Sequence, residues 1–489
     1  MFSFFLALVA DPALADYSTN ASPGVQPVPY DPKAFRPDPS YTNDAYNADV
    51  QLRIYGDKRA VPTTRPMIEI GRELYRQGPF EPGYDWLGKK NLIFANLLVS
   101  GDWRNAVGYN KVSPTDYGIA ATRLDLDVDL RFTATERIHA FFRPLDKNGR
   151  FTSATFGTGN NKGKLPLNGN ADALFFEGDA GAITAGLTGH DSKFDLPFTF
   201  GLIPLLFQNG VWLQDAFTGV AFTIPARNSK LFDFSNFDVT FFAGFDDINS
   251  PAFVTGTNKT PDTKDGRVVG VAFFVDAMQG YWEGGYAYLI GDDALDGASY
   301  NNFTLAFTRR YFNRLSNSIR VIANAGQEGL PGIGRTANGV VFLMENSLVT
   351  SRPYTLVPYC NLFAGIDHPQ SVARDAGAGG VLNNTGILFE PDALSGYPNL
   401  DATANNTYGG ALGLEYLFNL DQQIILETAT VQVFDDANNR VAKGAEYGLG
   451  VRYQLPLNHS WILRADAMYG WRDSNTDIAG TRVELRYKF

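Results

Sequence analysis

Three aspartates alternate with apolar residues in the segment LDLDVDLRF, residues 124 to 132. Side chains of a β-strand point alternately to its two faces, so Asp125, Asp127 and Asp129 project from one face about 6.8 Å apart. Carboxylates at this spacing attract cations and can serve as Ca²⁺ ligands. Ca²⁺, however, takes about six to eight oxygens from different directions, and one strand supplies them in a line. The pattern therefore favours a charged wall over a metal site.

Further charged residues occupy the same alternating positions in other segments of the chain. Facing the aspartates, they can create a transverse field across a cavity, or they can form salt bridges that stiffen a wall. The sequence leaves both interpretations open. The complete set of expected wall residues that line the interior is Asp125, Asp127, Asp129, Arg131, Arg309, Arg320, Arg452, Arg464, Arg482, Glu484 and Arg486.

Enzymatic chemistry is not indicated by the remaining reactive residues. The chain has four histidines, and neither G-x-S-x-G nor H-E-x-x-H occurs. Cys360 is the only cysteine, which excludes internal disulfides and cysteine zinc sites. The net charge of -11 argues against nucleic acid as a partner. We expect no catalytic residues, no metal and no cofactor.

The elements that carry these residues are strands, because the same alternation recurs along the chain. It runs through residues 237 to 245, 303 to 309, 319 to 323, 446 to 455 and 461 to 471. Short connections alternate with long polar ones, as in membrane β-barrels, whose turns lie at one end and whose long loops lie at the other. The pattern predicts an all-β fold, a closed antiparallel transmembrane β-barrel of about 18 strands. The count is about 16 if residues 171 to 188 and 357 to 365 are not strands.

The chain ends in TRVELRYKF, where apolar residues alternate with charged ones up to the terminal Phe489. Tyr487 stands third from the end. This ending resembles the assembly signal of Gram-negative outer-membrane porin-type proteins, without indicating a subfamily. The resemblance implies location in the bacterial outer membrane, contact with its lipid and recognition by the barrel-assembly machinery. A homo-oligomer such as a trimer is left open beside a monomer.

The resemblance and the barrel pattern together predict a channel for passive diffusion of small hydrophilic solutes or ions. The acidic residues suggest a weak preference for cations. The alternative is a barrel that serves as a scaffold for a periplasmic partner in electron transfer or export. Aromatic residues at alternating positions predict girdles at the two water interfaces. The candidates are Tyr286, Tyr288, Tyr453, Trp461, Tyr469, Trp471, Tyr487 and Phe489.

The start of the chain differs from the barrel. Residues 1–15 read as a signal peptide, with the apolar segment FSFFLALVA and the cleavage pattern Ala13-Leu14-Ala15. Residues 16–93 read as a periplasmic segment that contains a short helix with Met67, Ile68, Ile70 and Leu74 on one side, either a plug or a cap of the barrel mouth. Residues 94–489 form the barrel.

Two connections are singled out by length and composition. The loop from about 366 to 406 is the longest, and we expect it to fold into the barrel and narrow it. The segment from 189 to 211 contains FDLPFTFGLIPLLF and is too apolar for an exposed loop. We expect it to pack inside the barrel or against a neighbouring subunit.

Overall fold

The structure is a computed structural model, and it describes most of the chain beyond residue 65. The described ranges are 66–71, 83–112, 115–147, 149–157, 161–231, 234–256, 259–330, 332–350, 355–375, 378–391, 394–418, 422–434 and 440–489. The expected signal peptide and most of the segment 16–93 lie outside these ranges. In the described part, no helix is long and apolar enough to cross a membrane.

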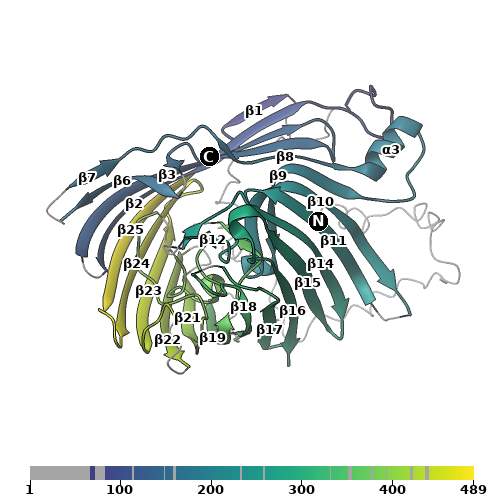
Figure 1. The fold of residues 1–489 in the computed structure, drawn as a ribbon. Coiled ribbons are helices and arrows are strands. Elements are labelled where there is room, and N and C mark those ends of the chain that lie inside the picture. The colour runs from purple at the N-terminus through teal and green to yellow at the C-terminus, as the bar shows by residue number, and fades with distance from the viewer. Residues whose placement is uncertain are drawn as a thin grey trace, which may run out of the picture. The chain divides into compact units, whose positions relative to one another are not determined.

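Within the described residues, 18 strands form one closed antiparallel ring. Figure 1 shows the strands curving around the interior. Each strand pairs with its two neighbours, and β25 closes the ring by pairing with β2. The ring consists of β2 (Asn96–Val112), β3 (Thr115–Arg131), β4 (Arg137–Phe142), β8 (Ala171–Asp179), β9 (Pro197–Phe207), β10 (Leu213–Ser229), β11 (Phe234–Asp246), β14 (Gly266–Ala277), β15 (Gly280–Gly291), β16 (Tyr300–Tyr311), β17 (Leu315–Ala325), β18 (Asn338–Leu348), β19 (Leu356–His368), β21 (Thr407–Phe418), β22 (Gln422–Val433), β23 (Glu446–Pro456), β24 (Trp461–Arg472) and β25 (Ile478–Lys488). The predicted count of 18 is confirmed, and the alternative of 16 is wrong.

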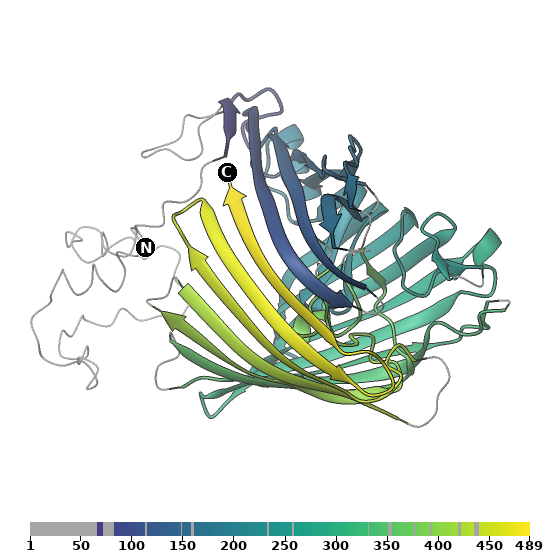
Figure 2. The ribbon, with the colours of Figure 1, turned by 90° about the vertical axis from the view of Figure 1, so that its left-hand side faces the viewer.

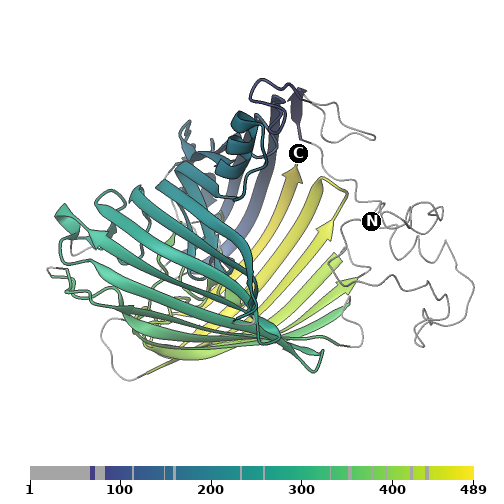
Figure 3. The same ribbon diagram turned by 90° about the vertical axis from the view of Figure 1, so that its right-hand side faces the viewer.

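The remaining elements are short and lie in the connections or beside the ring. They are β1 (Ile68–Gly71), β5 (Asp146–Lys147), β6 (Arg150–Phe156), β7 (Lys162–Lys164), β12 (Val254–Thr255), β13 (Thr260–Pro261), β20 (Ala373–Arg374), helix α3 (Ala180–Thr188) and the 3-10 turns η3 (Gln208–Gly210), η4 (Asp293–Leu295) and η5 (Asn383–Thr385). Connections at one end of the strands are mostly short, and we call it the turn end. The other end, with the long connections, is the loop end. Figure 3 shows this arrangement along β10 to β17.

The prediction of a helix near residues 67 to 78 is wrong for the residues of this segment that the structure describes. Residues 68–71 form β1, which pairs with residues 96–99 of β2. Isoleucine is β-branched and favours an extended backbone, and β2 is longer than its partner β25. β1 therefore completes the edge of β2 that β25 leaves unpaired, close to the C-terminus in Figure 2. Leu74 lies outside the described residues.

The prediction for residues 189 to 211 is also wrong in part. Residues 197–207 form the wall strand β9 instead of a loop, because a membrane wall can be apolar on both faces, with its outward face toward lipid and its inward face against packed side chains. The tip that joins β9 to β10 nevertheless packs inside the ring, as expected. Helix α3 begins after Asp179 and connects β8 to β9. The Asp179 carboxylate accepts a hydrogen bond from the Ala182 backbone N–H (2.7 Å).

Three connections of the loop end fill much of the interior of the ring, the lumen. The β9–β10 tip crosses to β16, where the Trp212 indole donates a hydrogen bond to Asn302 Oδ1 (2.9 Å). The segment 247–253 after β11 places Phe253 against Tyr300 of β16. The long connection between β19 and β21, residues 369–406, places Phe389 against Phe363 of β19. The expectation that this long connection, here called the inserted loop, folds into the barrel is confirmed.

Candidate functional site: an arginine-lined cavity in the lumen

The three aspartates of β3 lie on the inner face of the wall, as the alternation of the strand dictates. Asp125 pairs with Arg123 (2.7 Å). Asp129 accepts from Arg137 (3.1 Å) and lies near His139. The other members of this row are also paired, Asp127 with His139 (3.4 Å) and Arg131 with Asp129 (3.2 Å). The aspartates therefore face cations on their own wall, and the described residues contain no cluster of three metal-ligating side chains.

Most of the predicted arginines continue this charged wall on the strands that close the ring. Asp466 of β24 lies at the centre of a cluster with three of them: Arg452 Nε (2.7 Å), Arg464 Nε (2.9 Å) and Arg482 Nη2 (2.8 Å). The remaining two pairs join β25 to β2: Glu484 to Arg104 (2.8 Å) and Arg486 to Asp102. The structure thus brings the predicted residues of β3, β23, β24 and β25 together on one continuous face.

Two predicted residues do not join this face. Arg320 of β17 is buried on the inner side of a different wall and pairs with Glu345 (2.9 Å). Arg309 of β16 pairs with Asn317 of β17. Ala306, three residues earlier on β16, pairs with Arg320 and therefore lies on the same face as Arg320. Alternation places Arg309 on the face opposite Arg320, where it donates to Gln279 at the turn end. The prediction for Arg309 as a lumen-lining residue is therefore wrong.

Between the charged wall and the inserted loop lies a cavity of about 320 Å³, here called the arginine cavity. Its wall side carries four guanidinium groups, from Arg104, Arg123, Arg143 and Arg482. Its loop side carries two carboxylates, Asp375 and Glu390, which are not expected from any strand pattern. Guanidinium groups therefore line the wall side of the cavity and carboxylates its loop side, and Arg104, Arg123 and Arg482 are also paired with carboxylates of the wall.

Two ion pairs connect the loop carboxylates to the wall on either side of the cavity. Asp375 accepts from Arg143 (3.4 Å), which also reaches Asp172 of β8 (3.2 Å). Glu390 accepts from Arg452 (2.6 Å) and lies near Arg464 (3.5 Å). Sequence reasoning missed Arg143 because it follows the last residue of β4 and belongs to no alternating run. Its Phe-Phe-Arg-Pro context shows only that a strand ends there.

Buried carboxylates of the wall hold the inserted loop in position. Glu427 of β22 accepts from the backbone N–H groups of Ile387 (2.9 Å) and Leu388 (2.8 Å) and from the Tyr359 hydroxyl. Within the loop, burial raises the pKa of the Asp401 carboxyl, and hydrogen bonds from Thr403 and Ala442 oppose this effect. The loop is thus tied to β22 through backbone groups, which do not depend on its side-chain sequence.

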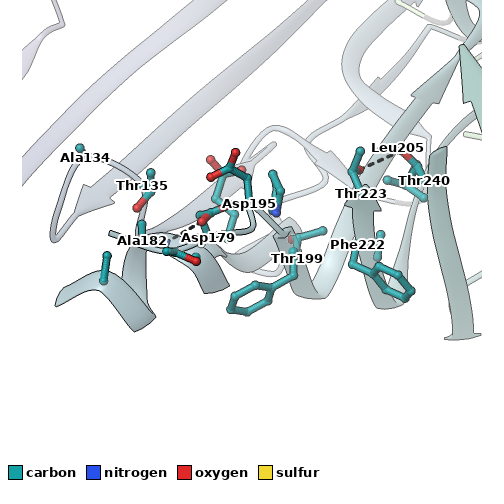
Figure 4. A pocket seen from close by; sticks show the side chains of 18 of the residues that line it. Ala134, Thr135, Asp179, Ala182, Asp195, Thr199, Leu205, Phe222, Thr223 and Thr240 are labelled. Carbon is teal, nitrogen blue, oxygen red and sulfur yellow. Dashed lines mark hydrogen bonds between the residues drawn. The ribbon is translucent and has the colours of Figure 1, made fainter. Parts of the chain in front are cut away.

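A second cavity, of about 890 Å³, lies at the turn end between α3, the turn after β3 and strands β9 to β11. Figure 4 shows Asp179 and Asp195 on one side of this cavity and Thr223 and Thr240 on the other. The hydroxyl groups of the two threonines form a hydrogen bond with each other (2.9 Å). Glu177 also lines it. This turn-end cavity presents carboxylates and hydroxyls, whereas the arginine cavity presents guanidinium groups.

The predicted girdle aromatics of the last strands form two groups at opposite ends of the wall. At the turn end, the Trp461 ring lies tilted beside that of Tyr487 (ring centroids 4.6 Å apart), and Tyr487 contacts Phe489 (5.4 Å). At the loop end, Tyr469 lies beside Trp471 (4.8 Å). Tyr453 lies with the first group and donates to Gln422, and Tyr286 and Tyr288 lie on β15. Two separated bands are what a membrane-spanning wall requires.

Comparisons with known proteins identify the fold. No family model matches the chain, and no curated protein matches its sequence. Its structure is similar to three crystal structures from Pseudomonas aeruginosa. For OccK11 (OpdR) the identity is 11%, the coverage is 80% of this chain and 96% of that chain, and the TM-score is 0.51. For OccK5 (OpdH) the identity is 10%, the coverage is 80% of this chain and 98% of that chain, and the TM-score is 0.52. For OccK2 (OpdF) the identity is 11%, the coverage is 80% of this chain and 97% of that chain, and the TM-score is 0.52. The fold is a porin-type β-barrel.

Proposed function

We propose that this protein is a bacterial outer-membrane channel through which small hydrophilic solutes diffuse passively, with a preference for solutes that carry negative charge. The observation that carries the proposal is the arginine cavity. A closed ring supplies the passage, inserted loops fill much of its width, and the charged wall lines what they leave. A passive channel needs no catalytic residue, metal or cofactor.

The preference for negative charge reverses the weak cation preference expected from the sequence. Asp125, Asp127 and Asp129 are paired with cations on their own wall, so they contribute little net field. Around the arginine cavity, four guanidinium groups, three of them also paired with wall carboxylates, present N–H donors opposite two loop carboxylates. OccK2 (OpdF) has been crystallised in complex with glucuronate, a carboxylate. A solute with one carboxylate and several hydroxyls would suit a cavity of this polarity.

The surroundings of the channel follow from the same proposal. Outer-membrane lipid would cover the outward face between the two aromatic bands, and the barrel-assembly machinery would recognise β25 during biogenesis. The oligomeric state, monomer or trimer, stays a prediction. The alternative function, a scaffold for a periplasmic or electron-transfer partner, is supported by no feature of the described residues.

Planar-bilayer recordings test the proposal directly. The purified protein should give stepwise conductance, and reversal potentials in a KCl gradient should show chloride preference. Arg123→Gln should lower the chloride-to-potassium permeability ratio about twofold, since one charge at about 8 Å in water changes the local ion concentration by that factor. Arg335→Gln is the matched control, because Arg335 is exposed in a loop.

Solute entry gives a second readout. Glucuronate added to KCl should interrupt the current, whereas uncharged glucose at the same concentration should not. A correctly folded protein that never conducts would refute the channel, and potassium preference in the wild type would refute the proposed charge preference while leaving the channel intact.

A further inference from the structure

Arg374 is a buried arginine at the joint between two inserted connections. It belongs to β20, which pairs in parallel with Leu213 and Gln214 at the β9–β10 tip. Its backbone N–H donates to the carbonyl of Asn249 in the third inserted connection (2.8 Å). The residue is 3% exposed. All three connections that fill the lumen therefore meet at this position.

The Arg374 guanidinium has only one hydrogen-bond partner among the described residues. Its Nη2 donates to the backbone carbonyl of Ala378 (3.1 Å), while Nε and Nη1 have none. No described carboxylate forms an ion pair with it. Consistent with this, burial without a compensating charge lowers the pKa of the Arg374 guanidinium to about 10. The side chain still carries its charge at neutral pH.

Other arginines that are equally buried in the ring are compensated. Arg320, 2% exposed, has Glu345 at 2.9 Å, and Arg482, 3% exposed, has Asp466 at 2.8 Å. A buried charge is costly unless it is paired and hydrogen-bonded, so this pattern is the expected one. Arg374 departs from it in the same molecule, which points to a partner that the described residues do not supply.

We propose that Arg374 binds a small inorganic anion, such as chloride, inside the lumen. The enclosure of the side chain limits the partner to a small ion, and its free donors, Nε and Nη1, require an acceptor with negative charge. The bound anion neutralises the joint where the inserted loop, the β9–β10 tip and the segment 247–253 meet. It thereby stabilises the arrangement that forms the arginine cavity. The site does not depend on the proposed channel function.

Thermal unfolding in two salts tests the site. The protein in detergent is compared in sodium chloride and in sodium gluconate at equal ionic strength, because gluconate is too large to enter. Chloride should raise the midpoint by about 2 °C or more in the wild type, since a ligand that binds only the folded state stabilises it. The shift should persist in the control Arg335→Met and disappear in Arg374→Met. Equal shifts in all three proteins, or no shift in the wild type, would overturn the proposal.

Bromide supplies a test that needs no variant, should Arg374→Met fail to fold. Crystals of the wild type grown in sodium bromide should show an anomalous peak in hydrogen-bonding distance of Arg374 Nε or Nη1. The peak should be exchangeable for chloride. Water at that position, with no anomalous signal, would refute the site even if the salts differ in their effect on stability.

Discussion

The two halves of the inner wall differ in chemistry, and the inserted connections make different contacts with each. From β14 to β18 the inner face is largely apolar, with Val268, Leu289, Ile322 and Val341 buried, and the buried ion pair of Arg320 with Glu345 interrupts it. From β23 through β25 to β3 it is charged. Each half closes the same ring with the same backbone pattern.

An apolar inner face is unfavourable in a water-filled lumen, so it must be covered. The inserted connections provide the cover. The Trp212 ring packs so closely against Gly285 of β15 that a Cβ atom at position 285 would lie 2.3 Å from a carbon of that ring. The inserted loop also covers part of the charged half, where Leu388 and Leu400 lie against Gly448 of β23 and Pro398 lies against Gly480 of β25. The arginine cavity remains where charged side chains of the wall and of the inserted loop face one another.

The largest effect is expected at the centre of the charged half. Asp466→Leu leaves Arg452, Arg464 and Arg482 without their shared carboxylate, which should reduce the free energy of unfolding by about 3–5 kcal/mol. Urea-induced unfolding in detergent micelles measures this loss. The control is Asp127→Asn, a half-exposed inner carboxylate for which we expect about 1 kcal/mol or less. Similar losses for both variants would show that Asp466 does not organise the cluster.

On the apolar half, the cover should make inward residues more sensitive than outward ones. Ile322→Ala, at a side chain that is 0% exposed, should reduce the free energy of unfolding by about 2–4 kcal/mol. Ile319→Ala on the outward face of the same strand, 46% exposed, is the matched control and should cost about half as much. Equal costs in the same unfolding assay would contradict the burial of this wall by the inserted connections.

A smaller effect is expected where the two halves are joined through the loop. Glu427→Gln keeps the shape of the side chain but weakens its hydrogen bonds to Ile387 and Leu388, which should cost about 1.5–3 kcal/mol. Faster cleavage within the inserted loop by a protease, with the barrel intact, is the expected observation. Glu328→Gln, on an exposed loop, should leave the cleavage rate unchanged. An unchanged rate in Glu427→Gln would show that this carboxylate does not hold the loop.

The smallest effect concerns the field between the two sides of the arginine cavity. Glu390→Gln removes one negative charge from the loop side, so the chloride-to-potassium permeability ratio should rise about twofold, by the same estimate as for Arg123→Gln but in the opposite direction. The rise should fade above about 1 M salt, where screening acts over about 3 Å. A lower ratio in this variant would mean that Glu390 acts on the cavity through loop position instead of charge.

Patterns of short range were enough to predict the ring and the direction of its side chains. Period-2 alternation is fixed by the strand itself, so the inward direction of Asp125 and the grouping of the aromatic bands followed from neighbouring residues. Arg309 shows the limit of this reasoning. Arg309 lies at a position of the same parity as Phe303 and Leu305, so alternation places it on the outward face, and its charge alone misled the prediction.

The sequence by itself determined that the chain forms a closed ring with charged residues on its inner face, because alternation and turn spacing are local properties. Only the tertiary structure decided which of these residues share a cavity. Arg143 and Asp375 are 232 positions apart, and Arg104 and Glu484 are 380 apart. Such pairs form only because the ring closes and its loops fold back inside it, and no local pattern records which distant residue will lie across the lumen.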